Sequence, residues 1–352
     1  MVSRMRSVVC CSMSSRRSVP AQVSLSDHAV ARCPLMRCIR STRLAATSSA
    51  HLAGSWWPPA GLRAKSTAIL DDDAPPLVEP SEGGTVVTVT SGKGGVGKTT
   101  TSASLAMGLA NRGFRVAALD FDIGLRNLDL HLGCERRIVF DFVNVINGEC
   151  KLHQALIKDR HQPNLHMLAA SQTREKEALK PEGVAEIISQ LRSEFDYVVC
   201  DSPAGIEHGA QQAMFHADIA LVCTNPELSS VRDSDKMISI IQSKSRRAEE
   251  QRDPVQQYLL ITRYEAEKVV GEAMLSAADI QEMLGIPLLG VVPEGEEVLK
   301  STNLGRPVIT QGAECDTGAA YEDVVKRFLG EECPLRFTQP KEKGFLSGLF
   351  GK

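Results

Sequence analysis

The feature that most constrains this chain is a glycine-rich segment that follows a short β-branched run. The segment reads Gly92-Lys93-Gly94-Gly95-Val96-Gly97-Lys98-Thr99 and fits the pattern G-x-x-x-x-G-K-[ST]. The residues before it, 85–90, predict a buried strand, and the Ala- and Leu-rich residues 99–111 after it predict a helix. Glycines let backbone N–H groups surround phosphate oxygens, and the helix adds its positive N-terminal end. The segment therefore predicts a phosphate-binding loop between a strand and a helix.

Two lysines in this segment have different predicted roles. Lys98 supplies a positive charge to the outer phosphates, and the Thr99 hydroxyl can ligate magnesium, so residues 92–100 are expected to bind ATP with Mg²⁺. Thr100 ends this nucleotide-binding run. Lys93 is either a solvated surface lysine or a cation that reaches a neighbour's nucleotide across a two-fold interface.

The rest of the body alternates between strands and helices. Strands are expected at 115–120, 197–201, 219–224, 258–262 and 288–292, and helices include 184–192 and 230–247. This alternation predicts an α/β P-loop NTPase with a mostly parallel twisted sheet and helices on both faces. Ligands of such sheets bind beyond the carboxyl ends of the strands.

Three acids stand at expected strand ends. Asp201 is the best candidate for a water-mediated magnesium contact, and Asp120 and Asp122 are placed two residues apart on one side of an extended chain. One of this pair can support the metal while the other orients the attacking water. Roles as helix caps or turn residues are the alternative for each acid.

The N-terminal region differs in composition from the body. Residues 1–70 hold ten Lys or Arg, thirteen Ser and one acid, Asp27, which is typical of a mitochondrial or chloroplast transit peptide, and the serines favour the chloroplast. A basic tail that stays attached is the alternative. Residues 71–84 form an acidic linker rich in Pro and Gly, residues 85–333 form the expected folded body, and residues 334–352 form a tail.

The tail ends in an apolar cluster between lysines. Phe345, Leu346, Leu349 and Phe350 recur on one face of a helix, which suits an anionic lipid surface. A frayed end or a small docked helix is the alternative. Burial of two Phe and two Leu yields on the order of 6–12 kcal/mol at most, whereas ordering the segment costs about 1–2 kcal/mol per residue. One tail should therefore bind weakly, and two tails on a dimer should hold.

Several segments together resemble a known family. They are Ser91 to Thr100, with Lys93 as a signature lysine; Asp120 to Asp129; Gly133-Cys134-Glu135-Arg136-Arg137; Asp201 to Glu207; Thr224-Asn225-Pro226-Glu227; and Ser229 to Asp235. This set is similar to the MinD/ParA ATPases with a deviant Walker A motif. The resemblance covers about residues 86–352 and is specific to the MinD branch, the septum site-determining ATPases. The basic leader makes the resemblance one to plastid members of that branch.

The resemblance implies a dimer that encloses two ATP molecules, with Lys93 crossing to the partner's nucleotide. It implies that Asp122 acts on water, that Asp120 and Asp201 lie near the metal with Thr99, and that Asp233 lies at the dimer and partner-binding surface. Implied partners are an anionic membrane, a MinE-like activator and, indirectly, the tubulin-like FtsZ division ring. The implied location is the chloroplast stroma and, peripherally, the inner envelope membrane.

Two other functions share this loop. An electron-transfer ATPase related to nitrogenase iron protein needs two cysteines per subunit facing a cluster across a dimer, and Cys134 and Cys200 do not fit that pattern. A DNA-segregating ParA-like ATPase needs a basic surface. Residues 71–352 hold 30 bases and 42 acids, which argues against that function and against a specific nucleic-acid partner.

Overall fold

The computed structural model describes residues 83–174 and 178–340. The strands are β1 (Thr85–Thr90), β2 (Val116–Asp120), β3 (Ile157–Lys158), β4 (Leu165–Leu168), β5 (Tyr197–Asp201), β6 (Ile219–Thr224), β7 (Gln256–Tyr264) and β8 (Leu288–Pro293). The α-helices are α1 (Lys98–Asn111), α2 (Leu128–His131), α3 (Phe142–Ile146), α4 (Leu152–Ala155), α5 (Pro181–Glu194), α6 (His208–Phe215), α7 (Leu228–Lys244), α8 (Arg246–Glu249), α9 (Ala266–Val270), α10 (Ala277–Leu284), α11 (Glu297–Asn303) and α12 (Asp316–Phe328). Two 3₁₀ segments, Glu135–Arg137 and Val308–Glu314, join them.

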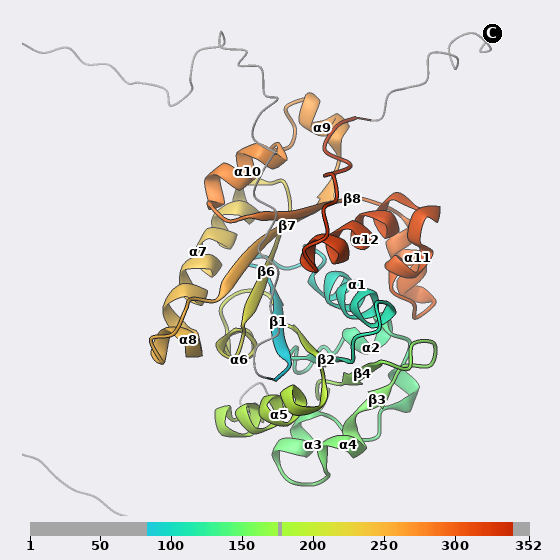
Figure 1. Ribbon diagram of the computed structural model, residues 1–352, viewed down its shortest axis with the longest axis vertical. Helices are drawn as coiled ribbons and strands as arrows, with labels where there is room; N and C mark the ends of the chain where they lie inside the picture. Colours follow the sequence, from blue (N-terminus) through green and yellow to red (C-terminus); the bar gives the residue numbers. More distant parts are fainter. Residues whose placement is uncertain (1–82, 175–177, 341–352) are drawn as a thin grey trace, which may run out of the picture. The chain divides into compact units, whose positions relative to one another are not determined.

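One sheet organises the described chain. Its strand order is β3-β4-β2-β5-β1-β6-β7-β8, and of the strands described β3 alone runs antiparallel to its neighbour. Helices cover both faces of this sheet, as Figure 1 shows. The prediction of a mostly parallel α/β P-loop NTPase sheet is therefore confirmed. Because β1 lies between β5 and β6, the loop that follows β1 opens at the centre of the carboxyl edge.

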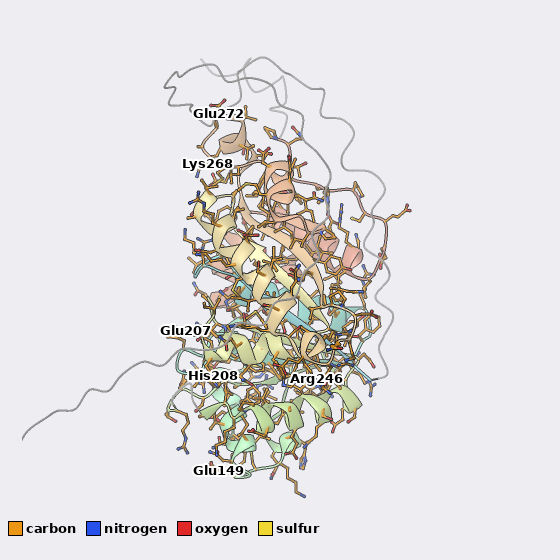
Figure 2. All side chains as sticks on the ribbon, turned by 90° about the vertical axis from the view of Figure 1, so that its left-hand side faces the viewer. Glu149, Glu207, His208, Arg246, Lys268 and Glu272 are labelled. Atoms are coloured by element: carbon orange, nitrogen blue, oxygen red, sulfur yellow. The ribbon has the colours of Figure 1, made fainter. Side chains whose placement is uncertain are left out.

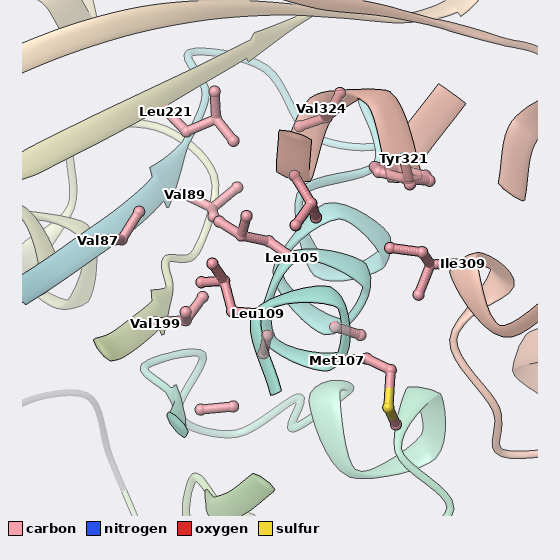
Figure 3. Packing of buried hydrophobic residues seen from close by; sticks show 14 of the residues in the cluster. Val87, Val89, Leu105, Met107, Leu109, Val199, Leu221, Ile309, Tyr321 and Val324 are labelled. Atoms are coloured by element: carbon pink, nitrogen blue, oxygen red, sulfur yellow. The ribbon is translucent and has the colours of Figure 1, made fainter. Parts of the chain in front are cut away.

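Alternating residues of the central strands divide the core into two layers. Val87 and Val89 of β1 face α1 and α12, and Val86 faces the opposite layer around α3 and α5. Figure 3 shows Leu105 and Leu109 of α1 on the side of the sheet that Val87 and Val89 face. A third cluster fills the space between β6, β7, α7 and α10. Buried apolar residues on both sides hold the sheet as a rigid platform for the loops at its edge.

The structure differs from two sequence-based expectations. The expectation of a single helix at 230–247 is wrong, because α7 ends at Lys244. Ser245 has an extended backbone, and its hydroxyl caps the N-terminus of α8 by accepting from Ala248 N. The strands β3 and β4 were not predicted, since both are short and β3 has only two residues. Among the described residues, no helix is long and apolar enough to cross a bilayer.

The predicted limits of the domains stay predictions. Residues 1–70, most of the linker 71–84 and the last residues, 341–352, lie outside the described part of the chain. The four apolar tail residues assigned to a membrane surface fall in that last segment.

Candidate nucleotide site

The glycine-rich loop forms an open cradle at the start of α1. Gly95 and Gly97 have φ angles of 77° and 90°, which L side chains rarely adopt. A Cβ atom on either glycine would meet no described atom within 4 Å, so the space before the loop is open. No side chain among the described residues caps this end of α1, and its first turn holds no acid. The loop therefore leaves backbone N–H groups and a positive helix end for an anion.

Lys98 is buried inside this cradle. Its side chain is only 8% exposed, and its Nζ donates to the Ser91 hydroxyl at 2.9 Å. Burial lowers the pKa of Lys98, and the nearby charge of Asp201 partly offsets that effect. A buried ammonium with so few partners is well suited to meet phosphate oxygens.

Asp201 ends β5 beside the cradle. Its Oδ1 accepts a hydrogen bond of 2.8 Å from the Ser102 hydroxyl, and its carboxyl also accepts one from Thr99. Burial raises the pKa of Asp201 to about 6, although these two hydrogen bonds and the charge of Lys98 act in the opposite direction. The Thr99 and Asp201 oxygens thus lie together at the mouth of α1.

Asp120 holds the following loop in place. Its Oδ1 accepts from Asp122 N at 2.8 Å, and its Oδ2 accepts from Asn127 N and Leu128 N, both at 3.1 Å. Burial, followed by the charge of Asp201, raises the pKa of Asp120 well above its usual range. Asp120 and Asp201 are register partners on β2 and β5. The metal assignment of Asp120 stays a prediction, and the observed role of its carboxyl is to organise residues 122–128.

Asp122 does not continue the strand. β2 ends at Asp120, and the chain turns where Ile123 N donates to Phe121 O at 3.0 Å. The expectation that Asp120 and Asp122 share one side of an extended chain is therefore wrong. Asp122 is half-buried, and its charge raises the pKa of Lys98, so it still lies near the cradle.

Lys93 lies away from the other lysine. Its Nζ is 2.7 Å from Glu227 Oε2 and 3.3 Å from the Ser229 hydroxyl, at the start of α7. Gly92 also meets α7, because a Cβ there would lie 2.3 Å from the backbone of Asp233. Asp233 itself is half-buried and pairs with Lys236 at 3.7 Å. The loop and α7 are thus packed together, and the surface role predicted for Asp233 stays a prediction.

Three site residues were missed in the sequence. The Ser91 hydroxyl accepts a hydrogen bond from Lys98 Nζ, and the Ser102 hydroxyl donates one to Asp201. The Thr262 hydroxyl of β7 donates to Val96 O at 2.6 Å. Ser102 lies one helical turn after Thr99, a spacing that the sequence does contain. Thr262 comes from a strand 166 residues away from Val96, and no local pattern points to it.

These residues fit a nucleoside triphosphate with magnesium. The uncapped N-terminus of α1, the glycine cradle and Lys98 would hold the phosphates, and the Thr99 hydroxyl and Asp201 would support the metal, either directly or through water. A bound magnesium ion supplies charge neutralisation between the outer phosphates.

Comparisons with known proteins agree with this geometry. A family model described as an AAA domain matches residues 84–252. The septum site-determining protein MinD of Escherichia coli strain K12 is 55% identical over 267 residues, which cover 76% of this chain and 98% of that protein. The chain belongs to the MinD family. The MinD of Neisseria meningitidis serogroup B is also 55% identical, over 269 residues.

Solved MinD structures share the fold. The MinD cell division protein of Aquifex aeolicus has a TM-score of 0.64 at 35% identity and covers 72% of this chain and 99% of its own. A MinD from Pyrococcus horikoshii, complexed with Mg-ADP, has a TM-score of 0.61 at 27% identity and covers 69% of this chain and 94% of its own. Membership of the MinD family confirms the prediction of a P-loop ATPase, and the second structure supports the prediction of nucleotide and Mg²⁺ as cofactors.

The two alternative functions are not favoured by the described residues. Cys134 and Cys200 are both buried, and burial raises the pKa of both thiols, that of Cys134 to about 12. Neither thiol is placed to face a cluster at a subunit surface. Figure 2 labels Arg246 and Lys268 on a face that also carries Glu149, Glu207 and Glu272. Arg246 pairs with Glu250 and Lys268 pairs with Glu265, and bases neutralised in this way contribute less to the basic surface that DNA binding needs.

The raised pKa of Asp201 predicts that acid pH stabilises the ligand-free fold and weakens the binding of Mg-ATP. Its pKa of about 6 lies above the ordinary 3.8, so protonation stabilises the ligand-free fold as the pH falls from about 6 toward 3.8. The same protonation removes the charge that supports magnesium. We expect the affinity for Mg-ATP, measured with a fluorescent ATP analogue, to fall below about pH 6. Asp201→Asn should bind weakly with a flat profile, and an unchanged pH dependence in that variant would contradict the assignment.

Proposed function

We propose that this chain is a membrane-associated ATPase that dimerises with ATP and positions the plastid division site through placement of the FtsZ ring. One observation carries the proposal: the phosphate loop holds two lysines, of which Lys98 is buried in the cradle and Lys93 points away from it to Glu227 at the start of α7. Membership of the MinD family supports the division-site part of the proposal. A lysine outside its own cradle is available to a second nucleotide, which supports the proposal of a dimer.

The position of Lys93 supports ATP-dependent dimerisation. Its ion pair with Glu227 joins side chains that are 40% and 51% exposed, and such pairs contribute about 0–1 kcal/mol. Exchange of this carboxylate for the phosphates of a neighbouring subunit therefore costs little. Gly94 and Gly95 are exposed beside Lys93, so a second subunit can approach the loop closely.

Replacement of the two lysines separates binding from dimerisation. Lys98→Ala should lose nucleotide binding and, with it, the dimer, whereas Lys93→Ala should bind ATP and remain a monomer. Light scattering with a non-hydrolysable ATP analogue measures the dimer, and fluorescence titration measures binding. Arg136→Ala, which removes a 90% exposed arginine, is the matched control. A Lys93→Ala dimer of normal stability would refute the action of this lysine across the interface.

The apolar tail provides the membrane part of the proposal. Its segment, residues 345–350, lies outside the described residues, so the support comes from its sequence and from the weak binding expected of a single copy. Two copies on one dimer gain effective concentration, which makes membrane residence depend on ATP. Hydrolysis then releases the protein.

A charged substitution in the tail tests this coupling. Phe350→Glu should lose most ATP-dependent sedimentation with anionic vesicles while its dimerisation in solution stays normal. ATP turnover with the same vesicles, with and without a MinE-like activator, should rise in the wild type and not in the variant. Sedimentation of Phe350→Glu at the wild-type level in ATP would exclude the tail as the membrane contact.

Other partners are proposed from the family. The MinC:MinD complex of Aquifex aeolicus contains a MinD that is 37% identical to this chain, with a TM-score of 0.63, and covers 73% of this chain. We place a MinE-like activator at the exposed part of α7 near Asp233, because the backbone of this helix contacts the phosphate loop at Gly92. An activator at that helix acts on the loop through direct packing.

The basic leader supports a plastid location, in the stroma and at the inner envelope. Residues 1–70 combine ten bases with thirteen serines and one acid. A fusion of these residues to a fluorescent protein should enter isolated chloroplasts and be shortened there, as seen by gel electrophoresis. A fusion with the eight arginines of residues 1–43 replaced by glutamine is the control. Import of the wild-type fusion into mitochondria alone would contradict the plastid assignment.

A further inference from the structure

Residues 333–340, which we call the strap, run back along α12 after this helix ends at Phe328. Arg336 joins the strap to the helix, because its Nε donates to Asp323 Oδ2 and its Nη2 donates to Ala319 O at 3.2 Å. Asp323 and Ala319 lie one turn apart on α12. Arg336 thus spans a full turn of the helix, in the direction of its N-terminus.

Apolar contacts hold the strap on either side of Arg336. Leu335 packs against the cluster between the sheet, α7 and α10, and Phe337 packs against the cluster around α1 and α12. The strap, α12, and Gly290 and Val291 of β8 enclose a cavity of only about 10 Å³, so the strap fits closely over the edge strand. Figure 1 shows this last described segment passing β8. Phe337 has a φ of 66°, an uncommon value for a non-glycine residue, which the packing maintains.

The ion pair between Asp323 and Arg336 stabilises the docked position of the strap. Asp323 is only 7% exposed, and besides Arg336 it pairs with Lys326 at the longer distance of 3.8 Å. The strap is part of what covers Asp323, so the closed clamp is an ion pair partly shielded from water, and such a pair is stronger than an exposed one. Removal of the Arg336 side chain with the strap still docked would leave this carboxylate with its weaker partner alone, which favours departure of the strap.

We propose that the Arg336–Asp323 clamp fixes the point from which the C-terminal membrane segment extends and so sets the strength of two-tail membrane attachment. This inference rests on the proposed membrane function. With the clamp closed, the spacer between Phe337 and Phe345 is residues 338–344, seven residues. With the strap released, the last fixed residue is Glu331, whose N–H donates to Lys326 O and whose side chain pairs with Arg112, so the spacer becomes residues 332–344, thirteen residues. Effective concentration falls as about the −3/2 power of spacer length, so release should weaken the second attachment about 2.5-fold.

Two variants of the full chain test the clamp independently. Arg336→Ala should release the strap, and insertion of six Gly and Ser residues after Pro340 should lengthen the spacer by the same amount with the clamp intact. Each should lower the ATP-dependent part of the affinity for anionic vesicles about 2.5-fold, and the two together about 4.5-fold. The difference between ATP and ADP is the readout, because the basic leader also attracts anionic lipid. ATP turnover without vesicles should stay unchanged, and Arg136→Ala is the control for loss of one positive charge.

Limited proteolysis provides a readout without membranes. Chymotrypsin cleavage after Leu335 or Phe337, followed by mass spectrometry, should become faster in Arg336→Ala and stay unchanged in the insertion variant. Normal vesicle affinity in Arg336→Ala, an unchanged cleavage rate, or an insertion without effect would each overturn the proposal. If wild-type protein shows no ATP-dependent vesicle binding, the proposed membrane function fails instead, and the cleavage rate alone then decides whether the clamp exists.

Discussion

The site depends on two acids that parallel pairing places side by side. Asp120 and Asp201 end β2 and β5 in register, and burial raises the pKa of both carboxyls. The charge of Asp201 raises the pKa of Asp120 further. Lys98 lies against this concentration of negative charge and is itself short of partners. The ligand-free arrangement is therefore electrostatically incomplete, and a divalent cation with a polyphosphate supplies both missing charges. Binding and folding stability oppose each other here, as is usual at functional sites.

Most of this platform could be predicted from the sequence. The β-branched run, the glycine loop and the Ala-rich helix formed a local pattern whose parts are contiguous, and the structure follows it within a residue at the start of α1. The strands 197–201 and 219–224 were also predicted at their observed bounds, because buried parallel strands are continuous apolar runs.

The parts that were missed depend on contacts between distant segments. Thr262 reaches Val96 from another strand, and Asp120 binds backbone N–H groups of a loop whose path the sequence does not specify. The break at Ser245 was hidden by helix-favouring residues on both sides, and it follows from a capping hydroxyl that competes with helix continuation. Lys93 was recognised as a separate cation, but its partner Glu227 became visible only when the loop and α7 were seen to touch.

The two edge strands of the sheet, β3 and β8, differ in length and in what lies beside them. β3 closes one edge with two residues, whereas β8, six residues long, lies under the strap. An uncovered strand of that length offers a row of unpaired backbone groups to any neighbour. At high local concentration, neighbouring copies would then meet edge to edge. Strap residues beside Gly290 and Val291 obstruct part of this edge, so a second copy of the chain lacks a continuous template there for extending the sheet.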